Sequence, residues 1–584
     1  FNRSTDNQYN SSDSGIVYQV VISTGPGPGF VAENYNYTSI YVGNSFSGIE
    51  NLTWSPGKHT VKAGVEFRSI QLNQEYGEHG KLTFSTVENL AANNLKKAGL
   101  TGSLPVNHLR KNDYFLYAQD EYKWRPGLVL NLGLRYTIFD LFHEKDGLAN
   151  PFDFATCGAQ GFCGVGAGFG QQNYGDIDPR VAFAWTLRRA GSTVIRSGFG
   201  LYHEDGQLDD QNLPAKNEVP SYSATGSASS PLSYCPPTLC ATALPFGAGT
   251  LSPNAEQRDR KDTYVEQWSF SAQQELPANF VGTVSYLGSH GVHLLETNVV
   301  NLIDPAREAV QYPSFAPAIG WRGSAGMSTY NGLSAAMRRS ITRGLLVTAN
   351  YMWLHEIDNG SNGSGDGDEI SPQNPLCQRC DTASGAWDAR HVFNGNAVYQ
   401  IPFGVGEPML NQHGIATAIA GNWQLTTTAL ARTGFPLNVL LPSNYVAADG
   451  ATGTERPDRI PGISLNPPQR RTVAQWINPA AFAAPAGEFG TALRDLVRGP
   501  GTWQIDLGAD KTFPLPERGR LEFRAEFYNI FNHPQPGQPQ STFNPSNTNG
   551  FGAITTTENL AVSPVTPVGS GTPREMQFAL RLEF

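Results

Sequence analysis

Residues 575–584 read Glu-Met-Gln-Phe-Ala-Leu-Arg-Leu-Glu-Phe and alternate between polar and apolar side chains. Successive side chains of an extended strand point to opposite faces, so this period of two predicts a β-strand. The apolar face holds Met576, Phe578, Leu580, Leu582 and Phe584. The other face holds Glu575, Gln577, Arg581 and Glu583. A face this charged has to meet water, and the opposite face has to be covered by apolar material.

The same alternation recurs along the chain, in residues 61–68, 128–136, 503–510 and 521–527. By itself it does not separate two kinds of fold. In a soluble sandwich the apolar face forms the core, whereas in a membrane barrel it contacts lipid. A second feature is needed to choose between them.

The lengths of the connections supply that feature. Tight turns rich in Pro, Gly and charge are expected at 55–58, 125–127, 188–191, 275–279, 340–344 and 515–519. Long connections rich in Gly, Pro, Ser and Asn lie at 72–112, 140–178, 203–262, 289–327, 356–390, 434–500 and 532–574. Short and long alternate, with 401–421 as the one imperfect short connection. Compact soluble domains rarely contain so many long loops, whereas outer-membrane barrels have short periplasmic turns and long extracellular loops.

We therefore predict an all-β fold, a transmembrane antiparallel up-and-down β-barrel that takes up residues 1–584. About 16 strands are expected in this chain. They lie near 15–22, 37–54, 60–71, 113–124, 128–139, 179–187, 193–202, 263–274, 280–288, 328–339, 345–355, 391–400, 422–432, 502–511, 520–531 and 575–584.

The composition agrees with such a barrel and excludes other classes. Hydrophobic residues are 39%, charged residues 16% and aromatic residues 11% of the 584 positions, and no apolar run reaches the roughly 18 residues of a membrane helix. The net charge of −10 argues against a nucleic-acid partner. The chain starts at Phe1, in a polar stretch without a signal peptide, so we expect a further segment before it.

Two groups of loop residues suggest cross-links or ions. Six cysteines form three close pairs, Cys157 with Cys163, Cys235 with Cys240, and Cys377 with Cys380, and local disulfides are expected. The alternative for the last pair is half of a zinc site. Residues 358–369 are rich in Gly and carboxylates, which makes Asp358, Asp366, Asp368 and Glu369 candidate Ca²⁺ ligands, with a solvated acidic loop as the alternative. No other cofactor is expected.

The charged side chains of the strands are expected to line or brace a wet interior. The candidates are Arg68, Arg135, Arg196, Glu522, Arg524 and Glu526. Asp388, Arg390 and His391 stand close in sequence, but their place at a loop end favours hydrogen bonding in the lumen or loop anchoring over acid/base catalysis. Because no nucleophile, base and orienting residue occur at recognisable spacing, we do not expect an enzyme.

Several motifs resemble the Oar-like branch of TonB-dependent receptors. They include Tyr330-Asn-Gly-Leu333, Asp388-Ala-Arg-His-Val-Phe-Asn394, Thr433-Gly-Phe-Pro436 and Arg524-Ala-Glu-Phe-Tyr-Asn-Ile-Phe-Asn-His533. The resemblance extends over most of the chain from about residue 45. It implies a barrel of about 22 strands in the outer membrane of a Gram-negative bacterium, an upstream plug and immunoglobulin-like domain, and energy from TonB.

Two functions remain open at this point. The first is TonB-dependent movement of a bulky extracellular solute through a plugged barrel, with outer-membrane lipid and the TonB complex as partners. The second is a structural or ligand-binding surface protein, or a passive porin, without TonB coupling. The sequence upstream of Phe1 would separate them, because only the first requires a plug and a TonB-contacting segment.

Overall fold

The computed structural model describes most of the chain and places it in one large β structure. The described residues are 2–8, 17–22, 30–33, 39–76, 79–101, 104–187, 193–206, 211–218, 220–226, 232–234, 249–304, 309–342, 344–360, 372–442, 455–487, 489–515, 519–558 and 573–583. The predicted turn at 188–191 and Phe584 lie outside them.

Nineteen strands form the main sheet. Three of them are two residues long: β10 (His143–Glu144), β15 (Ala255–Glu256) and β22 (Ala383–Ser384). The other sixteen form what we call the wall: β1 (Asn2–Gln8), β4 (Ser39–Trp54), β5 (His59–Tyr76), β8 (Leu104–Arg125), β9 (Leu128–Ile138), β11 (Ile177–Leu187), β12 (Thr193–Glu204), β16 (Thr263–Leu276), β17 (Phe280–Val300), β20 (Ile319–Thr342), β21 (Leu345–Asp358), β23 (His391–Gln400), β24 (Trp423–Arg432), β29 (Thr502–Pro514), β30 (Arg520–Tyr528) and β31 (Glu575–Glu583).

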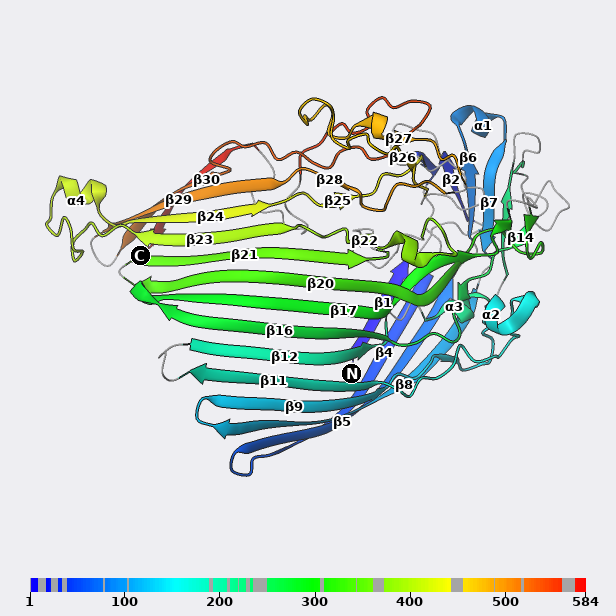
Figure 1. The fold of residues 1–584 in the computed structure, drawn as a ribbon, viewed down its shortest axis with the longest axis horizontal. Helices are drawn as coiled ribbons and strands as arrows, with labels where there is room; N and C mark the ends of the chain where they lie inside the picture. Colours follow the sequence, from blue (N-terminus) through cyan, green and yellow to red (C-terminus); the bar gives the residue numbers. More distant parts are fainter. Residues whose placement is uncertain are drawn as a thin grey trace.

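From β4 to β31 each strand of the wall pairs antiparallel with the next strand of the wall, and β1 pairs with β4 on its other side. The strands lie side by side, with the short connections at one end and the long ones at the other (Figure 1). Gly57, Gly127 and Gly344 in the short turns have φ of 60°, 85° and 76°, the left-handed region that glycine adopts most easily. The predicted up-and-down order with alternating connections is confirmed.

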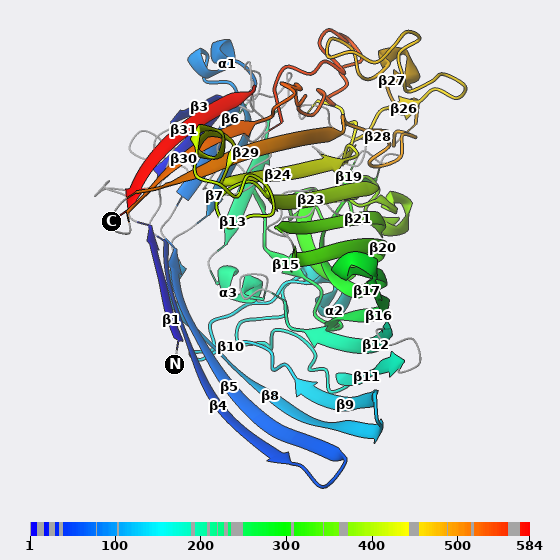
Figure 2. The ribbon, with the colours of Figure 1, turned by 90° about the vertical axis from the view of Figure 1, so that its left-hand side faces the viewer.

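The wall is strongly curved (Figure 2). Among the described residues, β31 pairs only with β30 and β1 only with β4, so the wall is an open arc of a barrel. Sixteen strands already leave it unclosed. A complete barrel has every strand edge paired inside the bilayer, so the described strands make up part of a barrel wall.

The predicted strand at 15–22 is real but was assigned to the wrong sheet. β2 (Val17–Ile22) belongs to a six-stranded sheet with β3 (Phe30–Glu33), β6 (His79–Phe84), β7 (Leu95–Thr101), β13 (Ser221–Thr225) and β14 (Thr250–Leu251). This extracellular sheet lies at the long-loop end (Figure 1). Periodicity marks a strand without naming its neighbours, and β1 takes the place in the wall.

Several predicted strands of the wall are longer than expected, β17 and β20 among them. β17 continues to Val300 and β20 begins at Ile319, although 289–327 was expected to be a loop. In these extensions polar side chains such as Glu296 and Asn298 are buried among the loops, so strand pairing continues after the apolar alternation has ended. The hydrophobic pattern therefore marks the membrane-spanning part of a strand and not its whole length.

Smaller elements occupy the connections. The helices are α1 (Val87–Ala91), α2 (Phe154–Cys157), α3 (Leu213–Lys216), α4 (Ile415–Ala420), and the 3₁₀ turns η1 (Gly158–Gln160), η4 (Pro277–Asn279), η5 (Gln378–Asp381) and η6 (Pro479–Ala481). Short strand pairs join β18 (Ile303–Asp304) to β19 (Ala309–Val310), β25 (Pro436–Leu437) to β28 (Val497–Arg498), and β26 (Asp458–Arg459) to β27 (Phe482–Ala483). No helix in the described part of the chain has the length and apolarity to cross a membrane.

The two faces of the wall differ as the alternation predicts. Leu116 lies across from Val65 and Tyr136, and Leu580 lies across from Phe523, so one row of apolar side chains runs over the sheet. These side chains are exposed: Leu580 keeps 68% of its surface and Leu116 47%. Large apolar side chains with this exposure would be unfavourable in water, and they are suited to contact with hydrocarbon.

Candidate functional site

The opposite face of the wall is concave, and loop segments pack against it. Ile70 and Leu72 of β5 are buried with Phe142 and Ala215, which belong to connections inside the arc. The side-chain amide of Asn212 donates to Gln74 Oε1 at 2.9 Å. These contacts identify the face of Ile70, Leu72 and Gln74 as the inner face of the wall. Arg68 lies on the same face, because it is separated from Ile70 by two positions on the strand.

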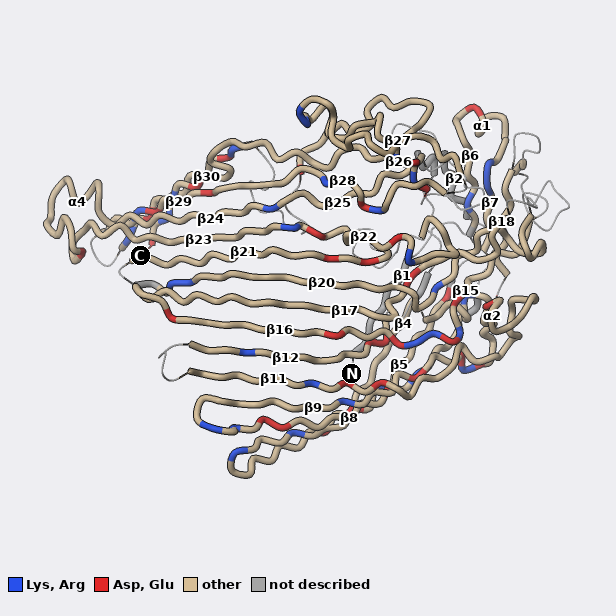
Figure 3. The backbone as a smooth tube through the Cα atoms, viewed as in Figure 1, with Lys and Arg blue, Asp and Glu red and all other residues tan. Residues whose placement is uncertain are grey.

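The six predicted interior residues all lie on strands of the wall: Arg68, Arg135, Arg196, Glu522, Arg524 and Glu526. Register places each of them opposite the face that carries Leu116 and Leu580. Charged residues gather near the strand ends and in the connections, while the middle of β17, β20, β21 and β23 carries none (Figure 3). Contact of any of these side chains with a solute stays a prediction.

Arg68, Arg135 and Arg524 contact carboxylates or an aromatic ring of the same wall. Arg68 donates to Glu66 Oε1 at 2.7 Å, and the guanidinium groups of Arg68 and Arg135 lie 5.0 and 4.7 Å from the centre of the Phe115 ring. Arg524 donates to Asp510 at 2.7 Å and to Glu522 at 3.0 Å. Such pairs stiffen a polar wall without requiring a ligand.

Above the wall, the connections after β24 and β30 form a packed unit, which we call the cap. It comprises the described residues of 433–501 and 529–558. Its buried core is Val439, Leu441, Ile477, Ala481, Phe482, Ala492, Val497, Phe543 and Phe551. Loops with a core of their own are held in place, so this part of the extracellular surface is a rigid structure.

Buried ion pairs tie the 358–391 connection to the cap. Arg494, of which 1% of the side chain is exposed, bonds to Asp358 and lies 2.8 Å from Asp495. Arg456 pairs with Asp381. Burial raises the pKa of Asp495 to about 6, and Arg494 opposes that rise. Ion pairs thus join five side chains from the two connections.

Asp388 is a second anchor. Its fully buried carboxylate accepts hydrogen bonds from Arg390 at 2.8 Å and from Arg498 of the cap. Burial alone would raise the pKa of Asp388, but these two hydrogen bonds outweigh burial and hold the pKa below its ordinary value. His391 instead shares a 2.7 Å hydrogen bond with the Tyr351 hydroxyl, so it is not part of an acid/base pair with Asp388. The geometry matches loop anchoring.

Disulfides join two of the three cysteine pairs, Cys157 with Cys163 and Cys377 with Cys380. Cys235 and Cys240 lie outside the described residues. Each bond closes a small extracellular loop.

Peptide mapping of the unreduced protein by mass spectrometry is expected to recover three local cross-links, including Cys235–Cys240. Their short separation favours pairing within each loop over pairing between loops. Reduction before digestion serves as the control and should convert all six cysteines to free thiols. Free thiols in the unreduced sample, or bridges between different loops, would contradict the pairing.

The predicted calcium loop is only partly described. Asp358 is held by Arg494, whose positive charge disfavours a cation beside it. Asp366, Asp368 and Glu369 lie outside the described residues, so the calcium site stays a prediction.

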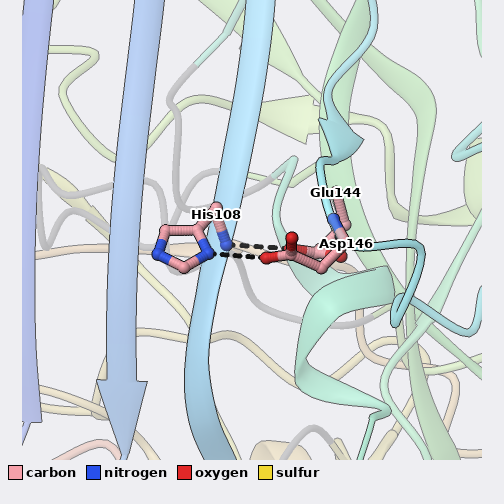
Figure 4. Close-up of side chains that lie close together, drawn as sticks. All are labelled: His108, Glu144 and Asp146. Atoms are coloured by element: carbon pink, nitrogen blue, oxygen red, sulfur yellow. Dashed lines mark hydrogen bonds and ion pairs between the residues drawn. The ribbon is translucent and has the colours of Figure 1, made fainter.

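His108, Glu144 and Asp146 form a further cluster (Figure 4). It was not predicted from the sequence. His108 Nδ1 and Asp146 Oδ2 are 2.8 Å apart. Glu144 accepts backbone hydrogen bonds from His108, Asp146 and Leu148, each at 2.9 Å. With its carboxylate used in this way, the cluster fastens a loop to β8 rather than offering a free ligand set for a metal. His108 and Glu144 are 36 residues apart in the sequence, so no local motif marks the cluster.

Comparisons with known proteins agree with this architecture. The family model described as "Outer membrane beta barrel domain" matches residues 2–577. Among curated protein sequences, none matches the chain.

Solved structures of outer-membrane proteins share the fold. The outer membrane transporter YddB from Escherichia coli is 13% identical, with a TM-score of 0.51, over 99% of this chain and 59% of that chain. P. aeruginosa FpvA bound to pyoverdines is 10% identical, with a TM-score of 0.44, over 96% of this chain and 51% of that chain. The chain thus spans little more than half of these proteins. The match over residues 2–577, together with the arc of antiparallel strands, shows that the chain belongs to the outer-membrane β-barrel domain family and resides in the outer membrane of a Gram-negative bacterium.

Proposed function

We propose that this chain forms the wall and the extracellular face of a transporter that moves a bulky solute across the outer membrane. In this proposal an upstream segment plugs the barrel, and the TonB complex supplies energy by pulling on that segment. Long loops on a rigid wall would bind the solute first. The lumen would then conduct it after the plug has moved.

The observation that carries the proposal is the size of the wall. Barrels of 16–18 strands already leave an aqueous channel, and barrels of about 22 strands have a plugged lumen. The sixteen strands of the wall in the described part of the chain leave the arc open, which supports a finished barrel of the larger class. An unplugged lumen of that width would let small solutes leak freely.

The cap supports a binding role for the extracellular face. Its apolar core and its buried ion pairs with the 358–391 connection hold these loops in a fixed arrangement. A preorganised surface loses less conformational entropy on binding than a flexible one. The same feature would serve a surface-display protein, so it does not by itself decide for transport.

Conductance in planar lipid bilayers tests the proposal on the full-length gene product, including whatever precedes Phe1. We expect no current at first, and a large stable channel once urea unfolds the plug, because the hydrogen-bonded wall resists unfolding in lipid. An open channel without urea would make the protein a passive porin. A membrane that stays closed in urea would make it a display protein, and either outcome would overturn the proposal.

TonB coupling needs its own measurement. The full-length protein in detergent is expected to bind the purified periplasmic domain of TonB, and loss of binding is expected when the residues upstream of Phe1 are removed. Absence of any binding would show that TonB does not take part. The conductance experiment would still test the plugged channel independently.

A further inference from the structure

The extracellular sheet presents two different faces. Leu82, Phe84, Ala98 and Leu100 are buried on one face, against partners that include Leu90. On the other face the register brings Lys81 opposite Gly99 and Lys97 opposite Thr83 in the β6–β7 pair. Lys97 in turn lies opposite Thr225 of β13. One face is therefore a small apolar core, and the other is polar and basic.

The basic face forms one side of a cavity of about 530 Å³, which we call the vestibule pocket. The other sides come from Tyr41 of β4, Lys216 at the end of α3, Asn254 and residues 316–320. Tyr41 pairs with Gln74, whose side chain lies on the inner face of the wall, so the pocket is at the mouth of the lumen. A solute bound there would stand on the path into the barrel.

The charge of the vestibule pocket is opposite to that of the chain. Lys81, Lys97 and Lys216 line it, and none of its lining residues is Asp or Glu, although the chain has a net charge of −10. Partial burial of Lys97 in the fold and, after it, repulsion from Lys81 and Lys96 lower the pKa of the Lys97 ammonium. Placing like charges together is unfavourable in the empty protein, and a bound anion would relieve it.

The spacing and the neighbours of the lysines indicate the kind of anion. Lys81 and Lys97 are diagonal neighbours on adjacent strands, where side chains start about 7–8 Å apart. Two lysine side chains that start this far apart can each reach a different acid group of one ligand. Between them the pocket offers the hydroxyls of Ser221, Ser223, Ser252 and Thr101 and the amide of Asn254. Such groups pair with the hydroxyls of a ligand.

We propose that the vestibule pocket binds a polyhydroxylated anion with at least two separated carboxylates, held by Lys81, Lys97 and Lys216. The cavity volume lies within the range of about 300–1,000 Å³ that holds small organic ligands. This inference rests on the proposed function, because it names the substrate class of that transporter. Binding itself requires neither a plug nor TonB.

Calorimetry on the folded full-length protein in detergent, at low salt, tests the inference with trigalacturonate as the probe. We expect saturable binding that is about tenfold weaker or more in the K81Q/K97Q double variant, since each lysine makes a charge-assisted contact. The methyl ester of the same trisaccharide has no charge and is expected not to bind. High salt should weaken binding as well.

Lys96→Gln is the matched control. Lys96 is the neighbour of Lys97 on β7 and does not line the pocket. It should leave the affinity unchanged. No saturable binding, equal binding of the ester, or an equal effect of K96Q would overturn the inference. If the protein binds trigalacturonate but forms no channel in urea, the proposed transport function is wrong and the binding site is still supported.

Discussion

Replacing Leu580 by Arg is expected to destabilise the folded barrel by about 2–4 kcal/mol. Leu580 lies on the outer face of β31, with 68% of its surface exposed, and faces Phe523 across the strand pair. In the bilayer this position contacts hydrocarbon, and a guanidinium group placed there loses its water. The measurement is the heat stability of the folded band on an unheated gel.

Gln577→Arg is the control for this substitution. Gln577 belongs to the same strand but points inward and lies opposite Glu526, which an arginine can pair with. We expect its heat stability to stay close to that of the parent protein. Equal loss in both variants, or no loss in Leu580→Arg, would show that the two faces of β31 are not distinguished by lipid.

Replacing Arg494 by Leu is expected to destabilise the cap by about 3–5 kcal/mol, because it leaves buried carboxylates without their cation. Asp358 and Asp495 would both lose their partner. Without Arg494 the pKa of Asp495 in the folded state rises further above its unfolded value, because Arg494 opposes the effect of burial. The destabilisation therefore grows as pH rises, and it should be larger at pH 8 than at pH 5.

Hydrogen exchange of the cap, residues 455–487 and 489–500, measures this loss, while the wall strands serve as an internal reference. Arg379→Leu is the matched control, since Arg379 sits in the neighbouring η5 turn but is exposed to solvent. Protection of the cap that is unchanged in Arg494→Leu would contradict the role given to the buried pairs.

The wall could be read from the sequence because its two environments are chemically opposite. Side chains such as Phe578 and Gln577 face lipid and water in turn, so the strand leaves a period of two in the chain. The order of short and long connections then gave the topology. Along 289–300 of β17 polar side chains such as Glu296 and Asn298 are buried by loop segments, so that signal disappears, and the strand was expected to be a loop.

The loop structures could not be predicted for a related reason. The cap core joins residues as distant as Val439 and Phe551, and no local pattern connects them. The vestibule pocket likewise combines Lys81 and Lys97, from the connection between β5 and β8, with Lys216 from the connection between β12 and β16. The assignment of β2 to the wall failed because the alternation within a strand does not show which strands it pairs with, here β6 and β3. These features depend on contacts between distant segments, which a single sequence does not display.

The central claim is that the apolar rows of the wall contact lipid hydrocarbon and the charged rows do not. Photolabelling with a carbene precursor in the lipid acyl chains, followed by mass spectrometry of residues 575–583, tests it most directly. The account predicts label on Met576, Phe578, Leu580 and Leu582 and none on Gln577 or Arg581. Label spread evenly over both sets, or confined to Gln577 and Arg581, would contradict it.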